Sequence, residues 1–89
     1  MEAEVQKQIR GYVVENFLYT RPDFAFTDDD PLLRKGVVDS LGVMELISFI
    51  EQTWDISIPP DDITEANFST VAQMAKYVAA RMAKDGSPA

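Results

Sequence analysis

Ser40 lies in the segment GVVDSLGVMELI, residues 36–47, where a polar loop gives way to an apolar stretch with helical spacing. A serine at the start of a helix can do one of three things. Its hydroxyl can cap the helix, act as a nucleophile, or serve as the point to which another group is covalently attached. Each role makes a different demand on the neighbouring residues.

Serine is a favoured N-cap because its side-chain oxygen accepts a hydrogen bond from an unpaired amide of the first turn. The reciprocal capping box is absent, since it needs Glu or Gln three residues later and Val43 stands there. Asp39 is an equally good cap, and capping by Asp39 would leave the Ser40 hydroxyl free. Both caps remain open on the sequence alone.

A nucleophilic serine needs a base to take its proton, and the chain contains no histidine. Lys35 is the nearest alternative base, but it lies in a polar loop and nothing in the sequence indicates that it is desolvated. The surrounding letters read VDSLG rather than the G-x-S-x-G of a nucleophile elbow. We therefore expect that the chain is not an enzyme.

Attachment makes fewer demands on this chain, because another enzyme can activate the hydroxyl. The positive end of the helix dipole also stabilises a phosphate that is bonded at a helix N-terminus. Ser40 is thus a suitable position for a phosphodiester.

The elements around Ser40 are predicted to be helical. Apolar residues recur at helical spacing over residues 2–19, 40–54 and about 70–84, and a short helix is expected up to Asn67. Pro22 and Pro31 interrupt residues 20–38, a long first loop in which a single turn can begin at Leu32. Ile56 and Ile58 anchor an extended connector that carries the chain's only strand signal. The pattern predicts an all-α four-helix bundle, with a domain over residues 1–85 and a flexible tail over 86–89.

The first loop contains three consecutive aspartates, Asp28 to Asp30. A calcium-binding EF-hand that began at Asp28 would need an oxygen ligand at its fifth place and glycine at its sixth. Leu32 and Leu33 occupy those places, so we interpret the run as a solvated turn.

The helix over residues 40–54 is more apolar than one buried stripe requires. Leu46 and Ile50 define a core stripe that Leu41, Ile47 and Trp54 extend. Val43, Met44 and Phe49 add apolar surface outside that stripe. A small domain buries such a helix fully only with difficulty, so we expect one face to meet a partner.

The formal net charge of −7 disfavours binding to nucleic acid or to an anionic membrane, and it suits basic protein partners. Cysteine is absent, which excludes disulfides and thiolate metal sites. No apolar run approaches the roughly 20 residues of a membrane span, and the polar N-terminus is unlike a signal peptide. We expect a cytoplasmic monomer without a bound metal.

The segment VDSLGVMELI, residues 38–47, resembles the phosphopantetheine-attachment motif of acyl carrier proteins and peptidyl carrier domains. FSTV, residues 68–71, resembles the start of the last helix in that family, and the likeness extends over roughly residues 3–83. It implies a free-standing carrier on which a phosphopantetheinyl transferase esterifies Ser40 with 4′-phosphopantetheine from coenzyme A. The thiol of that arm would carry an acyl or aminoacyl group as a thioester.

The resemblance also assigns roles to neighbouring residues. Asp39 would help the transferase to bind, and Leu41 would pack at the helix start or contact the transferase. A partner-facing surface is expected to include Val43, Met44, Glu45, Ile47 and Glu51. The chain departs from fatty-acid carriers in having Gly42 where many have aspartate, and in having fewer acids along this helix.

The cargo implied is that of fatty-acid, polyketide or nonribosomal-peptide-type biosynthesis, delivered by a loading ligase and passed to acyl-transferring enzymes. An alternative is a peptidyl or D-alanyl carrier that an adenylating ligase loads. A second alternative is a small helical adaptor without an arm, in which Ser40 is only a helix cap.

Overall fold

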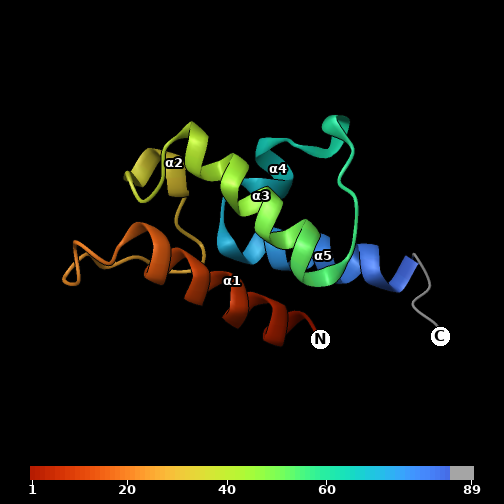
Figure 1. Ribbon diagram of the computed structural model, residues 1–89, viewed down its shortest axis with the longest axis horizontal. Helices are drawn as coiled ribbons and strands as arrows, with labels where there is room; N and C mark the ends of the chain where they lie inside the picture. Colours follow the sequence, from red (N-terminus) through yellow and green to blue (C-terminus); the bar gives the residue numbers. More distant parts are fainter. Residues whose placement is uncertain (85–89) are drawn as a thin grey trace.

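The computed structural model describes residues 1–84 as a bundle in which three long helices surround one core (Figure 1). The all-helical prediction is confirmed, and residues 1–84 contain no strand, so Ile56 and Ile58 lie in an irregular connector. The predicted tail over 86–89 and the domain boundary at 85 lie outside the described residues. In chain order the elements are α1 (Glu2–Phe17), α2 (Leu32–Lys35), α3 (Ser40–Trp54), the 3-10 helix η1 (Pro60–Asp62), α4 (Glu65–Phe68) and α5 (Val71–Lys84).

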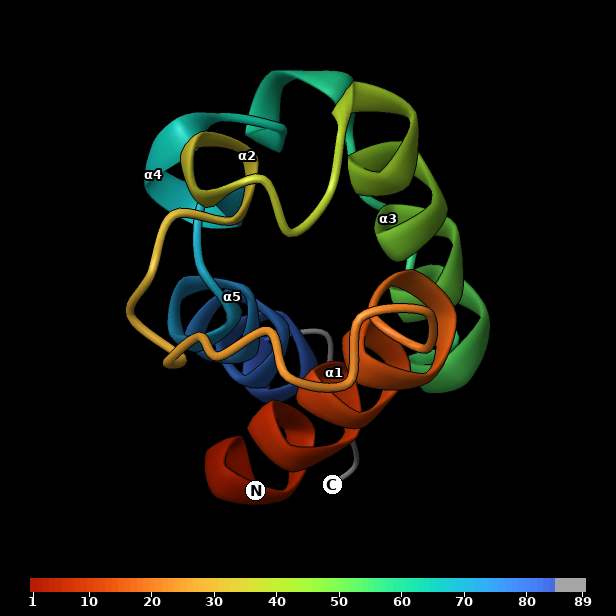
Figure 2. The ribbon, with the colours of Figure 1, turned by 90° about the vertical axis from the view of Figure 1, so that its left-hand side faces the viewer.

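The core forms where the apolar stripes of α1, α3 and α5 meet (Figure 2). Seen end-on, these three helices are arranged around a common centre, and α2 and α4 lie together on the remaining side. The Leu32 amide at the start of α2 donates to the Ser69 carbonyl after α4, at 2.9 Å. Each long helix contributes almost fully buried side chains to the core, namely Val5, Ile9 and Val13 from α1, Leu46, Ile47 and Ile50 from α3, and Val71, Met74, Ala75 and Val78 from α5.

Some of the apolar side chains of α3 that lie outside its core stripe make contacts within the fold. The Phe49 ring stacks on Tyr12 of α1 with 4.1 Å between ring centroids, and Trp54 meets Phe49 edge-on at 5.8 Å. Such aromatic pairs stabilise packing beyond the area that they bury. Phe49 therefore packs α3 against α1, and Trp54 supports Phe49 from the same helix.

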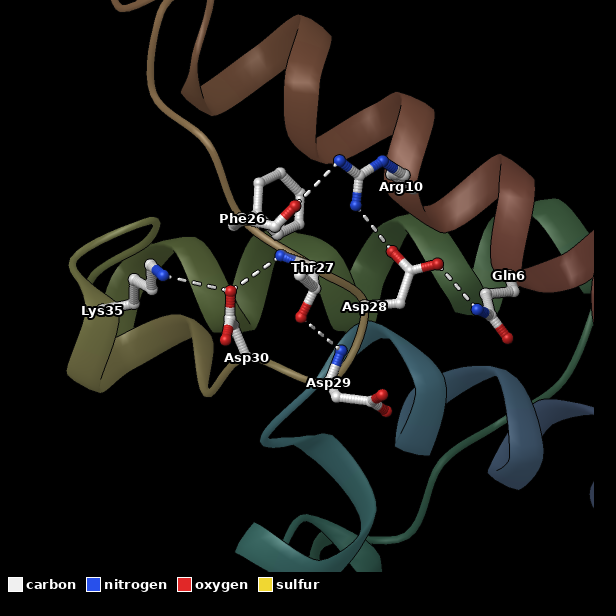
Figure 3. Close-up of polar contacts among 8 residues, drawn as sticks. All are labelled: Gln6, Arg10, Phe26, Thr27, Asp28, Asp29, Asp30 and Lys35. Atoms are coloured by element: carbon white, nitrogen blue, oxygen red, sulfur yellow. Dashed lines mark hydrogen bonds and ion pairs between the residues drawn. The ribbon is translucent and has the colours of Figure 1, made fainter.

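The aspartate run in the first loop forms a turn, as the sequence predicted, but only Asp29 is exposed, whereas Asp28 and Asp30 are partly buried and bonded within the fold (Figure 3). The Asp28 carboxylate accepts hydrogen bonds from Gln6 at 2.6 Å and from Arg10 at 2.7 Å, both on α1. The Asp28 carbonyl accepts from the Ala72 amide of α5 at 2.9 Å. Asp28 therefore ties the loop to the first and the last helix.

The neighbouring Asp30 folds the loop back on itself. Its carboxylate accepts from the Thr27 amide at 2.7 Å and pairs with Lys35 at 3.2 Å (Figure 3). The Thr27 hydrogen bond, and after it the Lys35 ammonium, hold the pKa of Asp30 below its ordinary value. These contacts fix the loop immediately before α2.

The connector after α3 is held in a similar way. Ile58 is buried as predicted, and its amide donates to the Glu51 carboxylate at 2.8 Å. Tyr77 of α5 donates a hydrogen bond from its hydroxyl to Asp62 at 2.6 Å, and burial together with this bond raises the pKa of Tyr77.

Thr70 and Gln73 form a reciprocal capping box at the start of α5.

Candidate functional site

The start of α3 is capped by Asp39 rather than by Ser40. Asp39 has the extended backbone of an N-cap, and its Oδ1 accepts from the Gly42 amide at 2.8 Å. The backbone carbonyl of Asp39 accepts from the Val43 amide at 3.0 Å. Of the two caps that the sequence allowed, the structure contains the one that leaves the Ser40 hydroxyl free.

Ser40 is exposed at the first position of α3, and its hydroxyl makes no hydrogen bond within the described part of the chain. It borders a shallow surface depression of about 600 Å³. We call this the Ser40 depression, which is lined by Phe17, Arg21, Leu33, Gly36, Val37, Val38, Asp39 and Ser40. The hydroxyl is therefore open to a large second molecule from this side.

The segment before Ser40 is shaped by a helix end. α2 stops at Gly36, which has φ of +79°, a left-handed conformation that glycine adopts without steric cost. The next residues, Val37 and Val38, are buried, with exposed fractions of 2% and 6%. These anchors fix the backbone that leads into Asp39 and Ser40.

Gly42 allows the start of α3 to approach α1 closely. A Cβ at this position would lie 3.0 Å from Cε1 of Phe17 and 3.0 Å from Cβ of Val38. These distances are shorter than ordinary van der Waals contacts, so a larger residue would push α3 outward. The aspartate that many fatty-acid carriers have here would not fit without such a shift.

The residues predicted to face a partner do not all lie on one surface. Leu41, Met44 and Glu45 are exposed, with exposed fractions of 69% for Leu41 and 51% for Met44. Leu41 is therefore not part of the core stripe, contrary to the helical periodicity. Ile47 is only 4% exposed and packs in the core, so its expected position near the partner surface is corrected.

The two remaining candidates, Val43 and Glu51, are half-buried. A carboxylate oxygen of Glu51 accepts a hydrogen bond from the Ile58 amide, so Glu51 stabilises the connector after α3. Val43 lines a cavity of about 190 Å³ between α2, α3 and α4, together with Leu32, Ile63 and Phe68. Val43 is thus partly covered and contributes to the wall of that cavity.

Sequence reasoning did not place Arg21 and Leu33 beside Ser40. Arg21 comes from the first loop, and its Nη2 donates to the Gly36 carbonyl at 2.9 Å. Leu33 is 52% exposed on α2. Arg21 and Leu33 reach the Ser40 depression only because of the folded path of the chain. No local sequence motif predicts their positions there.

Within residues 1–84 no group of three or more His, Cys, Asp or Glu side chains is arranged to hold a metal ion. No helix in this part of the chain is long and apolar enough to cross a membrane. An exposed hydroxyl is accessible to modification by another enzyme.

The chain matches one family model and is similar to several carrier proteins. The family model described as "Phosphopantetheine attachment site" matches residues 8–78. A D-alanyl carrier protein of Lactobacillus delbrueckii subsp. bulgaricus is 25% identical over 75 residues, which cover 84% of this chain and 90% of the relative. A probable acyl carrier protein, PigG, of Serratia sp. is 28% identical over 74 residues, covering 83% and 84%. A D-alanyl carrier protein of Streptococcus pyogenes is 36% identical over 50 residues, covering 56% and 63%.

Proposed function

This chain belongs to the family of carrier proteins that have a phosphopantetheine attachment site, and we propose that Ser40 is the residue that carries the 4′-phosphopantetheine arm. The observation that supports this assignment is the exposed Ser40 hydroxyl, which is free of hydrogen bonds in the described structure because Asp39 caps the helix. The open depression beside it leaves room for a donor and an enzyme.

The attachment step is a phosphoryl transfer carried out by a phosphopantetheinyl transferase. The Ser40 oxygen bonds to the phosphorus of coenzyme A that carries pantetheine, and the pyrophosphate bond breaks. Adenosine 3′,5′-bisphosphate leaves, and the hydroxyl proton passes to a base of the transferase, because this chain has no histidine to accept it. The product is a phosphodiester on Ser40 with a terminal thiol.

The neighbouring side chains would then have two kinds of role. Asp39 keeps the first turn of α3 formed and presents a carboxylate to the transferase. Leu41, Met44 and Glu45 are the exposed side chains that would meet the transferase and the loading enzymes, and Val43 and Glu51 would contribute at the edges of that surface. Ile47 would support this face from within the core. A negatively charged domain speeds such short-lived encounters with basic partners.

The cargo is proposed to be an acyl or aminoacyl group, held as a thioester and presented to enzymes of fatty-acid, polyketide or nonribosomal-peptide-type biosynthesis. D-alanyl carriage is a second candidate, because D-alanyl carrier proteins from two genera are among the relatives. The two candidates differ in loading, since a D-alanyl carrier needs an adenylating ligase and ATP. Incubating the arm-bearing protein with ligases and a panel of activated acids, then measuring intact mass, separates them.

The attachment itself is tested by intact mass after incubation with coenzyme A, magnesium and a broad-specificity phosphopantetheinyl transferase. We expect one phosphopantetheine on the wild type and none on Ser40→Ala. Ser48→Ala is the matched control, because Ser48 is an exposed serine of the same helix, and it should be modified like the wild type. A folded wild type that gains no mass would favour the helical adaptor without an arm.

A further inference from the structure

The depression that Ser40 borders contains one cation, Arg21, whose guanidinium is already held in place. Its Nη2 donates to the Gly36 carbonyl at 2.9 Å, and its central carbon lies 4.5 Å from the centroid of the Phe24 ring. An arginine fixed by a carbonyl and an aromatic face loses little further freedom on binding an anion. No carboxylate forms an ion pair with Arg21 within residues 1–84.

The other cations near Ser40 are placed differently. Lys35 is paired with Asp30 at 3.2 Å. Arg34 is two residues beyond Leu32 on α2, but it borders the cavity between α2, α3 and α4 instead of the Ser40 depression. Arg21 is therefore the cation that lines the same depression as Ser40.

Asp39 already occupies two of the amides near the start of α3. The Gly42 amide is taken by the Asp39 carboxylate at 2.8 Å, and the Val43 amide by the Asp39 carbonyl. A phosphodiester on Ser40 would add another negative charge beside Asp39, on a chain whose formal net charge is already −7. A nearby arginine offsets that repulsion, because its planar fork matches two phosphate oxygens.

We propose that Arg21 binds the phosphodiester that links the arm to Ser40 and so positions the first bonds of the arm over the Ser40 depression. This inference rests on the proposed function, since it requires the arm to be on Ser40. Each free phosphate oxygen would be two bonds from the serine oxygen, so the contact lies within the depression that both residues line. Arg21 is a positioning residue, and the thiol at the far end of the arm remains mobile.

The test compares wild type, Arg21→Gln and Arg34→Gln after modification. Both substitutions remove one positive charge, but only the first removes it from the Ser40 depression. Phosphorus-31 NMR reports the mobility of the phosphodiester directly. We expect a broad line for wild type and Arg34→Gln and a narrower line for Arg21→Gln, and added salt should narrow the wild-type line.

A second measurement uses the unsubstituted protein, which keeps the proposal testable if Arg21→Gln does not fold by circular dichroism. The side-chain Nε–H resonance of Arg21 should shift when the arm is attached, and that of Arg34 should not. Equal phosphorus line widths in the two folded variants, or an Arg21 resonance unchanged by attachment, would overturn the proposal. Intact mass separates the failure of this inference from the failure of the proposed function. If Ser40 is never modified, both are refuted. If Ser40 is modified but the phosphodiester and Arg21 do not affect each other in either NMR measurement, only the inference is refuted.

Discussion

The Asp39 carboxylate and the Gly42 amide are joined by a 2.8 Å hydrogen bond that closes the first turn of α3. This bond assigns capping to Asp39 and leaves the adjacent Ser40 hydroxyl free. It also gives Asp39 two separable properties, a capping oxygen and a negative charge.

Substitutions at Asp39 should separate those properties. Asp39→Ala loses the cap and should lower the free energy of unfolding by about 1 kcal/mol. Asp39→Asn keeps a capping oxygen and should remain close to wild type in stability, while being modified more slowly if the transferase uses the charge. Urea unfolding followed by circular dichroism measures the first effect and timed intact mass the second. Equal modification rates for Asp39→Asn and wild type would show that the transferase does not use the negative charge of Asp39.

Ser40→Ala should leave the stability of the fold within about 0.5 kcal/mol of wild type, because the hydroxyl makes no hydrogen bond in the described structure. A loss of about 1 kcal/mol, typical of a lost cap, would show instead that Ser40 shares the capping role. Urea unfolding of the unmodified proteins decides between the two.

Two glycines should respond to alanine in opposite directions. At Gly42 the new Cβ would lie 3.0 Å from Phe17 and Val38 atoms, and overpacking should outweigh the better helix propensity, giving a net destabilisation of roughly 1 kcal/mol. Gly11 is an exposed position of α1, and a Cβ added there would have no atom within 4 Å. Alanine at this position should therefore stabilise the fold by about 0.5–1 kcal/mol. A stabilised Gly42→Ala would contradict the close approach of α3 to α1.

The loop contacts of Asp28 should matter more for stability than those of its neighbour Asp29. Asp28→Ala removes the acceptors of Gln6 and Arg10, and for a partly exposed group we expect a loss of roughly 1–2 kcal/mol. Asp29 is exposed, and only its backbone amide is bonded, so Asp29→Ala should be nearly neutral. Equal effects of the two substitutions would mean that the Asp28 side-chain contacts do not stabilise the fold.

Asp30 should contribute to the dependence of stability on pH. Its folded-state pKa is lowered, first by the Thr27 hydrogen bond and then by Lys35, below the ordinary value of 3.8. A lowered pKa stabilises the fold at pH values above 3.8, and this contribution is lost as the pH falls through the folded-state pKa. Thermal midpoints measured from pH 6 down to pH 2 should therefore fall less steeply for Asp30→Asn than for wild type. Parallel curves would show that Asp30 contributes nothing.

The local pattern of the sequence was sufficient to predict the long helices. The bounds of α3 were predicted as they occur, because an uninterrupted apolar period follows a cap residue and no proline intervenes. Ile58 was also predicted correctly as an anchor, since its apolar side chain stands in an otherwise polar connector. These signals depend only on residues that are neighbours in the sequence.

The sequence failed where partners come from distant segments. The hydrogen bonds of Asp28 are made with Gln6, Arg10 and Ala72, which lie far from it in the chain. Periodicity placed Leu41 in the core stripe, but in the first turn of α3 this side chain is exposed. Arg21 enters the site only because of the path of the first loop.

Trp54, the only tryptophan of the chain, ends α3, and Ser40 begins it. A helix rises 1.5 Å per residue, so the two residues are separated by about 21 Å along the axis. The indole lies edge-on against Phe49, which stacks on Tyr12 of α1. Its intrinsic fluorescence should therefore respond when α1 and α3 separate, yet be little affected by an enzyme or a cargo at the serine. The molecule thus has a built-in optical probe of its own folding at the end of α3 opposite the attachment site.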